Sequence, residues 1–439
     1  MPDKGELPGR VRAGYGLGSV ATGSFGTVPG LMLLPYLTDT LGITALLAGV
    51  IVFAPKAWDV ILNPIAGRVS DRSVDPRGPR RPFLLRSGLA LAVCFALLFA
   101  APDLGSRWAG ALWVLVAFVA CATAYAFFQV PYIAMSAEIT DSYHERTRLM
   151  GWRVSILAFA ILVSGACAPA IRNAFGGRTG YQVMGVAIGV LLAIGALGAY
   201  AGTRHAPIGA VVTRPGTVRD QLRLVAGARD FRLLLGTFVV QAVATGAMLA
   251  GVDYMSRWVL GDKDLSTVLF VCFVGPALVC TPLWGVAGRR VGKRVGYAAA
   301  SLVLAVAALV MVGARTLPHW SVFVATGLVG VGYAGVQVFP LAMLPDCAAL
   351  DARRTGSNRI GVYTGVWTAG ETLGLAIGPG VYALVLAIGG YVSSTSGDGV
   401  QPSSALTAIT LGFSLVPGIL VLLSLIPLQR YALTEQELQ

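Results

Sequence analysis

Residues 125–138 read Tyr-Ala-Phe-Phe-Gln-Val-Pro-Tyr-Ile-Ala-Met-Ser-Ala-Glu, and residues 333–346 read Tyr-Ala-Gly-Val-Gln-Val-Phe-Pro-Leu-Ala-Met-Leu-Pro-Asp. Seven of the fourteen positions match at an offset of 208 residues when the final Glu and Asp count as equivalent acids. A weaker repeat places Pro64-x-x-Gly67 and Arg72 opposite Pro282-x-x-Gly285 and Arg290, at an offset of 218. The chain is therefore predicted to consist of two similar halves.

The composition around these repeats is that of a membrane protein. Of the 439 residues, 56% are hydrophobic and only 12% are charged, whereas soluble domains carry about 25% charged residues. A net charge of +12 would suit nucleic acid in a soluble protein, but in a membrane protein the placement of Lys and Arg sets orientation instead. The composition excludes a disordered chain, a nucleic-acid-binding module and an ordinary cytosolic enzyme.

Twelve apolar runs are each long enough for a transmembrane helix of about 20 residues. They lie at residues 14–38, 44–67, 83–101, 108–136, 150–171, 181–203, 232–256, 265–288, 295–314, 318–344, 361–390 and 405–427. We expect an all-α integral membrane fold with a six-helix half over residues 1–203, a cytoplasmic linker over 204–231 and a second half over 232–439. Two parallel six-helix repeats are a known transporter plan, with the substrate bound between them near the midplane.

The distribution of basic residues predicts the orientation. With the N-terminus inside, the inner segments hold 24 of the 33 Lys and Arg residues and the outer loops hold 6. Basic residues concentrate in cytoplasmic loops. This bias predicts a multi-pass protein of the cell membrane with both termini in the cytoplasm.

Charged residues within the spans are the strongest functional signal, because each costs a few kcal/mol at the bilayer centre. In the second run, Lys56, Asp59 and Asn63 are spaced by three and four residues, which places them on one helix face. The fifth run contains Arg153 and the eleventh contains Glu371. A local Lys56–Asp59 ion pair and snorkelling of Arg153 to the membrane surface are the structural alternatives to a functional role.

Uncharged polar and aromatic residues complete the predicted site. Asp59 and Glu371 are the expected proton or cation carriers, with Asn63 beside the coupling site, and Lys56 and Arg153 supply positive charge. The expected substrate-lining residues, besides Lys56 and Arg153, are Tyr125, Gln129, Gln337, Tyr363 and Trp367. Glutamine amides are expected to face a cavity, because polar groups facing lipid are unfavourable.

Acidic and basic residues cluster after the second and eighth runs. Asp71 and Arg72 in the first half, and Arg289 and Arg290 in the second, are expected to lie at cytoplasmic helix ends and to act as a gate by pairing with opposite charges at neighbouring helix ends. A solvated, positively charged loop is the alternative interpretation.

Several short motifs have simpler explanations. Gly330-x-Gly332-x-x-Gly335 has the spacing of a dinucleotide fingerprint, but it lies inside an apolar span, where close helix packing explains it better. The sequence shows no catalytic constellation, no metal-ligand spacing and no cofactor motif. We therefore expect a non-enzymatic monomer whose partners are a small-molecule substrate and the lipid bilayer, with no metal, no cofactor and no nucleic acid.

The combination of motifs resembles the glycoside–pentoside–hexuronide:cation symporters, the melibiose-permease group of the major facilitator superfamily. The resemblance is carried by motifs from the second, fourth and fifth runs and from the segment between the tenth and eleventh. These are Trp58-Asp59-x-x-x-Asn63-Pro64-x-x-Gly67, Val130-Pro131-Tyr132, Glu145-Arg146-Thr147-Arg148, Arg153, Leu344-Pro345-Asp346, Asp351, Arg354-Thr355-Gly356, Arg359-x-Gly361 and Gly365-x-Trp367. Eukaryotic lysolipid transporters and plant sucrose carriers share parts of this pattern.

This chain also departs from the pattern that the resemblance implies. Asn63 stands where the family has a second carboxylate in helix 2, which weakens a sodium site. Gly23 and Gln129 replace two acidic sugar ligands, and Glu371 replaces a frequent Lys, whereas Arg153 matches the family's sugar-site arginine. The resemblance implies alternating access with cation-coupled symport of a sugar or glycoside, and the departure at Asn63 favours a proton over sodium as the coupling ion. Because the acidic sugar ligands are absent, a proton-coupled exporter of a drug-like, secondary-metabolite or lysolipid-like compound is the alternative.

Overall fold

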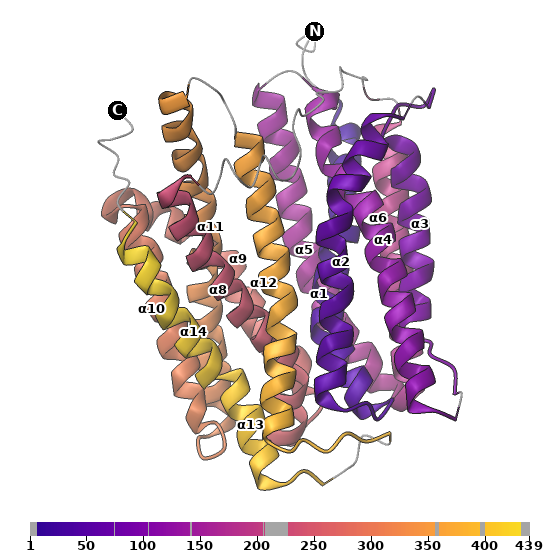
Figure 1. Ribbon diagram of the computed structural model, residues 1–439, viewed down its shortest axis with the longest axis vertical. Coiled ribbons are helices and arrows are strands. Elements are labelled where there is room, and N and C mark those ends of the chain that lie inside the picture. The colour runs from indigo at the N-terminus through magenta and orange to yellow at the C-terminus, as the bar shows by residue number, and fades with distance from the viewer. Residues whose placement is uncertain are drawn as a thin grey trace. The chain divides into compact units, whose positions relative to one another are not determined.

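The computed structural model describes residues 7–73, 75–103, 105–140, 143–204, 206, 227–355, 360–395 and 400–431, and every regular element in these ranges is a helix. The first half contains α1 (Gly9–Asp39), α2 (Ala45–Asp71), α3 (Arg81–Leu98), α4 (Arg107–Ile139), α5 (Tyr143–Phe175) and α6 (Gly177–Thr203). The second contains α8 (Arg229–Tyr254), α9 (Leu265–Val291), α10 (Lys293–Val310), α11 (His319–Thr355), α12 (Ile360–Ile388), α13 (Ser403–Phe413) and α14 (Leu415–Gln429). Figure 1 shows these helices as long rods.

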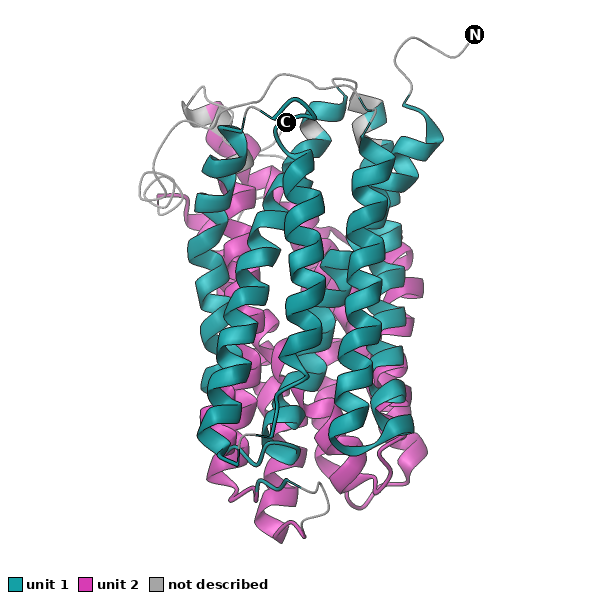
Figure 2. Cartoon of the chain, turned by 90° about the vertical axis from the view of Figure 1, so that its right-hand side faces the viewer, with its two compact units in different colours: residues 1–43, 50–214, 393–398 teal, residues 44–49, 215–392, 399–439 magenta. Residues whose placement is uncertain are grey.

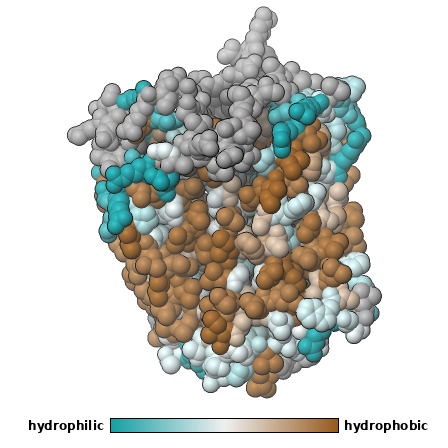
Figure 3. Space-filling view, in the orientation of Figure 1, coloured by the Kyte–Doolittle hydropathy of each residue, from teal (hydrophilic) through white to brown (hydrophobic). Residues whose placement is uncertain are grey.

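Twelve helical segments in the described ranges are long and apolar enough to cross a membrane, which confirms the predicted number of spans. In the space-filling view, apolar residues cover the long middle stretches of the visible helices and hydrophilic residues gather toward the helix ends (Figure 3). This pattern is typical of helices surrounded by lipid, where the backbone polar groups are satisfied within each helix. The protein is a multi-pass membrane protein.

The last span departs from the expected single helix. It is divided at Ser414, whose φ of −119° and ψ of −69° separate α13 from α14. Pro417 lies in the first turn of α14, and its ring would clash with the carbonyl oxygen of Phe413 in a continuous helix. The proline therefore favours a break at Ser414, although α1, α2 and α9 continue through prolines of their own.

The chain forms two compact units, which are coloured separately in Figure 2. The first consists of residues 1–43, 50–214 and 393–398, and the second consists of residues 44–49, 215–392 and 399–439. Most of the expected linker, residues 204–231, lies outside the described residues.

Glycines allow close helix crossings within each unit. In the first unit, a Cβ atom on Gly14 of α1 would lie 2.4 Å from the Cα atom of Gly202 in α6. In the second, a Cβ atom on Gly330 of α11 would lie 2.2 Å from the carbonyl oxygen of Phe273 in α9. The glycine fingerprint in α11 therefore serves helix packing, as the sequence indicates.

Substitution of Gly14 tests this packing. Gly14→Ala should lower the free energy of unfolding by about 1–3 kcal/mol, because the new methyl group forces two backbones apart. Gly26→Ala in the same helix is the matched control, since nothing lies within 4 Å of its Cβ position. The measurement is the apparent melting temperature of each purified variant in detergent, and equal melting temperatures would contradict the interpretation.

Candidate functional site

The helix 2 cluster occupies the middle of α2 in the first unit. Asp59 is 6% exposed, and its Oδ1 atom is buried without a hydrogen-bond partner among the described residues. Lys56 and Asn63 both interact with the Asp59 carboxylate, but Lys56 and Asp59 form no direct ion pair there. The amide oxygen of Asn63 is also buried without a hydrogen-bond partner in the part of the chain that is described. The three residues lie together, as the helix spacing predicts. Two of their oxygen atoms, one on Asp59 and one on Asn63, remain able to accept hydrogen bonds.

Arg153 of α5 is held over an aromatic ring. Its guanidinium carbon lies 5.7 Å from the centre of the Tyr132 ring in α4, a distance at which a cation is attracted to the ring face. The Tyr132 hydroxyl donates to the carbonyl oxygen of Tyr15 at 2.7 Å and lies 3.0 Å from the Ser19 hydroxyl, both in α1. Tyr132 is therefore fixed from α1 and positions the arginine.

Gly23 and Gln129 stand where the resemblance implies acidic sugar ligands, and the two residues have different surroundings. A Cβ atom on Gly23 would lie 3.2 Å from Leu157 and 3.3 Å from Ala160, so α1 and α5 pack closely there and leave no room for a carboxylate side chain. Gln129 in α4 is half-buried and makes no hydrogen bond within the described ranges. One turn earlier, the Tyr125 ring lies 4.4 Å from that of Phe25.

In the second unit, Glu371 of α12 belongs to a polar group with two residues of α11. The carboxylate interacts electrostatically with Tyr333, and the Gln337 amide donates to the Tyr333 hydroxyl at 2.9 Å. All three side chains are half-buried. Tyr333 is not among the site residues predicted from the sequence. The repeated Tyr-x-x-x-Gln string, in which it is the equivalent of Tyr125, is the signal that could have indicated it.

Tyr363 and Trp367, which are expected to line the substrate site, are buried against α8. Each is 1% exposed. The Trp367 ring stacks on Phe238 of α8 with centroids 4.4 Å apart, and the Tyr363 ring meets the edge of Phe231 in the same helix at 4.8 Å. Their four-residue spacing does place them on one face of α12, but that face packs against α8.

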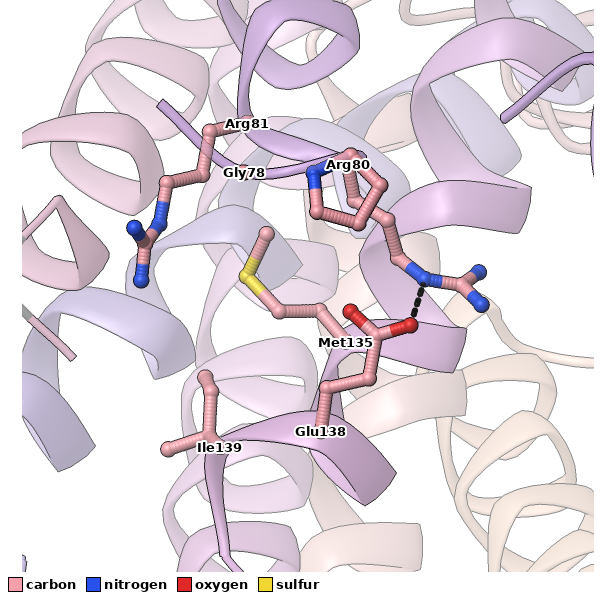
Figure 4. Close-up of a pocket in the computed structure, with 7 residues that line it drawn as sticks. Gly78, Arg80, Arg81, Met135, Glu138 and Ile139 are labelled. Atoms are coloured by element: carbon pink, nitrogen blue, oxygen red, sulfur yellow. Dashed lines mark hydrogen bonds and ion pairs between the residues drawn. The ribbon is translucent and has the colours of Figure 1, made fainter. Parts of the chain in front are cut away.

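One expected gating residue of the first unit, Asp71, is joined to Glu138 through Arg80, which precedes α3. Arg80 donates to the Asp71 carboxylate at 2.8 Å and also to the Glu138 carboxylate at the end of α4. Figure 4 shows Arg80 and Glu138 side by side in a small pocket with Gly78, Arg81, Met135 and Ile139. Arg80 is 5% exposed and Glu138 is 8% exposed, so this cluster is buried, unlike a solvated loop.

The second unit contains a related ion pair. Lys293, the first residue of α10, donates to the Asp346 carboxylate of α11 at 2.6 Å. Asp346 is the repeat equivalent of Glu138, so each unit ties the acid that ends the repeat to a basic residue at the start of its third helix.

Three of the expected gating residues do not take part in these pairs. Arg72, Arg289 and Arg290 are exposed and form no ion pair among the described residues. The prediction selected basic residues at the ends of α2 and α9, whereas those at the starts of α3 and α10 reach the carboxylates.

The next basic residue in each unit caps another helix. Arg81 donates to the carbonyl oxygen of Ala206, just beyond the end of α6, at 2.5 Å. Arg294 donates to the carbonyl oxygen of Gln429, the last residue of α14, also at 2.5 Å. Cations at helix C-termini satisfy free carbonyl groups and oppose the helix dipole. Arg80 and Arg81 therefore connect α3 to α2, α4 and the end of α6, and Lys293 and Arg294 connect α10 to α11 and α14.

A further carboxylate anchors the N-terminal segment. Glu145 accepts the backbone N–H of Leu7 at 3.1 Å and lies 3.6 Å from Arg12 and 3.0 Å from Arg148. Burial acts to raise the pKa of Glu145, but the Leu7 N–H group and the two guanidinium groups outweigh it and lower that pKa below the ordinary value.

Comparison with known proteins identifies the family. Residues 14–435 match the family model described as MFS/sugar transport protein. The chain belongs to the MFS/sugar transport protein family. It is a secondary transporter of this family and not an enzyme.

Similar proteins cover nearly the whole chain. It is 25% identical over 444 residues to the glucuronide carrier protein homolog of Escherichia coli strain K12, covering 98% of this chain and 94% of that protein. It is 24% identical over 426 residues to the isoprimeverose transporter of Lactiplantibacillus pentosus, covering 94% and 86%. Among solved structures, a D-xylose–proton symporter has a TM-score of 0.73 at 14% identity, covering 98% of each chain. That last likeness shows the major facilitator fold.

Removal of Arg80 should destabilise the first unit. Arg80→Met should lower the free energy of unfolding by about 3–5 kcal/mol, because it leaves the buried Glu138 carboxylate and the half-buried Asp71 carboxylate without this partner. Adding Glu138→Met should recover part of the loss. Arg72→Met is the matched control and should change stability by about 0.5 kcal/mol or less. Thermal unfolding of the purified variants measures the effect, and an equal shift for Arg80→Met and Arg72→Met would refute the assignment.

The Glu145 contacts predict a pH dependence. A carboxylate whose folded-state pKa is lowered stabilises the fold above its unfolded pKa, and that stability is lost as the pH falls through the lower folded value. The melting-temperature advantage of wild type over Glu145→Gln should therefore be complete at pH 7 and disappear below the ordinary glutamate value of 4.5. An advantage that stays constant down to pH 3 would contradict this assignment.

Proposed function

We propose that this transporter is a proton-coupled symporter of a sugar or glycoside, with Asp59 as the proton carrier. The observation that carries the proposal is the buried Asp59 carboxylate, one oxygen of which has no hydrogen-bond partner among the described residues. A buried ionic group that is incompletely satisfied is unfavourable. Binding a proton neutralises it, so uptake and release of a proton is the chemistry that this group suits.

The surroundings of α2 favour a proton over sodium. Sodium is a hard cation and prefers several oxygen ligands, whereas this helix face offers one carboxylate and the Asn63 amide. Toward α4, Leu62 and Ala66 pack on Ala126, with Phe127 and Val130 around them. The Trp58 indole N–H also donates to the Thr123 hydroxyl of α4 at 3.2 Å. Lys56 already supplies a positive charge next to Asp59, which disfavours a second cation.

The relatives and the hydrogen-bond donors in the first unit support the proposed substrate class. The two curated relatives are named for glucuronide and isoprimeverose, which supports a sugar or glycoside. Arg153 and Lys56 are hydrogen-bond donors, and Gln129 can both donate and accept. Such groups suit sugar hydroxyl and ring oxygens, and Tyr125 adds an aromatic surface. We further propose import across the cell membrane by a monomer with both termini in the cytoplasm.

Transport in proteoliposomes under separate ion gradients tests the coupling. Wild type should accumulate its glycoside under an inward proton gradient without sodium. Asp59→Asn should abolish gradient-driven accumulation while exchange of internal for external solute continues, because the variant mimics the neutral carboxyl group. Asp264→Asn, an exposed carboxylate preceding α9, is the matched control.

Three results would count against the proposal. Sodium-driven accumulation without a proton gradient would overturn the ion assignment. Full proton-driven accumulation by Asp59→Asn would remove Asp59 from coupling. Efflux of a drug-like or lysolipid compound, with no glycoside uptake, would replace the substrate class with the exporter alternative.

A further inference from the structure

Among the described residues, Glu371 is a charged residue of the second unit that has no ion partner. Two other acidic residues in the helices of that unit do have basic partners: Asp253 lies 3.5 Å from Arg257, and Asp346 lies 2.6 Å from Lys293. Glu371, by contrast, makes no hydrogen bond or ion pair within the described residues, and it lies near the middle of the span Val362–Ile388. A carboxylate at that depth marks a functional position by default.

The groups around Glu371 present acceptors. Gln337 donates its amide N–H to the Tyr333 hydroxyl, and its carbonyl oxygen makes no hydrogen bond within the described ranges. The Tyr333 ring lies 5.1 Å from that of Phe273, so two aromatic rings are adjacent on this side of α11. A carboxylate, an amide oxygen and aromatic rings together suit an ammonium group, which donates several hydrogen bonds and is attracted to ring faces.

We propose that Glu371, Gln337 and Tyr333 form an amine-recognition site, so that the preferred substrate is a sugar or glycoside bearing a protonated amino group. This inference rests on the proposed function and narrows its substrate class. The carboxylate supplies the counter-charge, the amide oxygen accepts a second N–H, and the Tyr333 ring faces the cation. The role of Glu371 is then substrate recognition, and Asp59 alone carries the coupling proton.

Matched sugar pairs test the proposal. The probes are D-glucosamine with D-glucose and D-galactosamine with D-galactose, each pair also as methyl β-glycosides. Binding is measured as a shift in melting temperature, and uptake is measured in proteoliposomes. The amine member of at least one pair should be preferred about tenfold, the factor that one charge-assisted hydrogen bond supplies.

Variants of the site residues test whether Glu371 and Gln337 cause the preference for the amino sugar. Glu371→Gln, which keeps the shape and removes the charge, should reduce the preference to near unity. Glu371→Asp should retain part of it, and Gln337→Leu should weaken it, which keeps the test decisive if one variant fails to fold. Asp264→Asn should keep the full preference. A preference that persists in Glu371→Gln would overturn the proposal.

The outcomes separate this inference from the proposed function. Accumulation of the neutral sugars without a preference for their amines would overturn the amine site and leave glycoside symport standing. A Glu371-dependent melting shift with tetraethylammonium, without binding or uptake of any sugar, would support a cation site and overturn the glycoside assignment. Failure of all these probes to bind would overturn both.

Discussion

The cost of placing a charge in a bilayer governs this structure. Each charged side chain in a span is unfavourable by a few kcal/mol unless it is paired or functional, so most of the chain is apolar and the few interior charges stand out. Arg80 and Lys293, near helix ends, have carboxylate partners within their own units. Asp59 and Glu371 do not have such ion partners among the described residues. The charges with ion partners stabilise the units, and the two carboxylates without such partners are the groups to which we assign function.

The paired charges show how the internal repeat works as structure. Glu138 and Asp346 end the two copies of the repeated string, and each is bound by a basic residue at the start of the third helix of its unit. The adjacent Arg81 and Arg294 cap the last helix of the same unit. Because the same three-helix connection occurs twice, each unit can hold together as a rigid body, which alternating access requires of the halves of a transporter.

The sequence predicts the architecture well, because hydropathy and helix spacing are local properties. It predicts the twelve spans and the shared face of Lys56, Asp59 and Asn63. It cannot say which way a helix face turns: Tyr363 and Trp367 share a face, but that face packs on α8. The contacts of long side chains are even harder to predict from the sequence. Arg72 and Arg80 both follow α2, and only the folded path of the chain shows that Arg80 reaches Asp71 and Glu138.

Proton movement driven by substrate is the most direct test of Asp59 as the carrier of the coupling proton. Proteoliposomes in a lightly buffered, sodium-free medium with an external pH dye would receive the transported glycoside. Wild type should alkalinise the medium as protons enter with the glycoside, and Asp59→Asn should take up glycoside by facilitated diffusion with no change in pH. Glycoside uptake by wild type without alkalinisation, accompanied by uptake of labelled sodium when sodium is supplied, would contradict it.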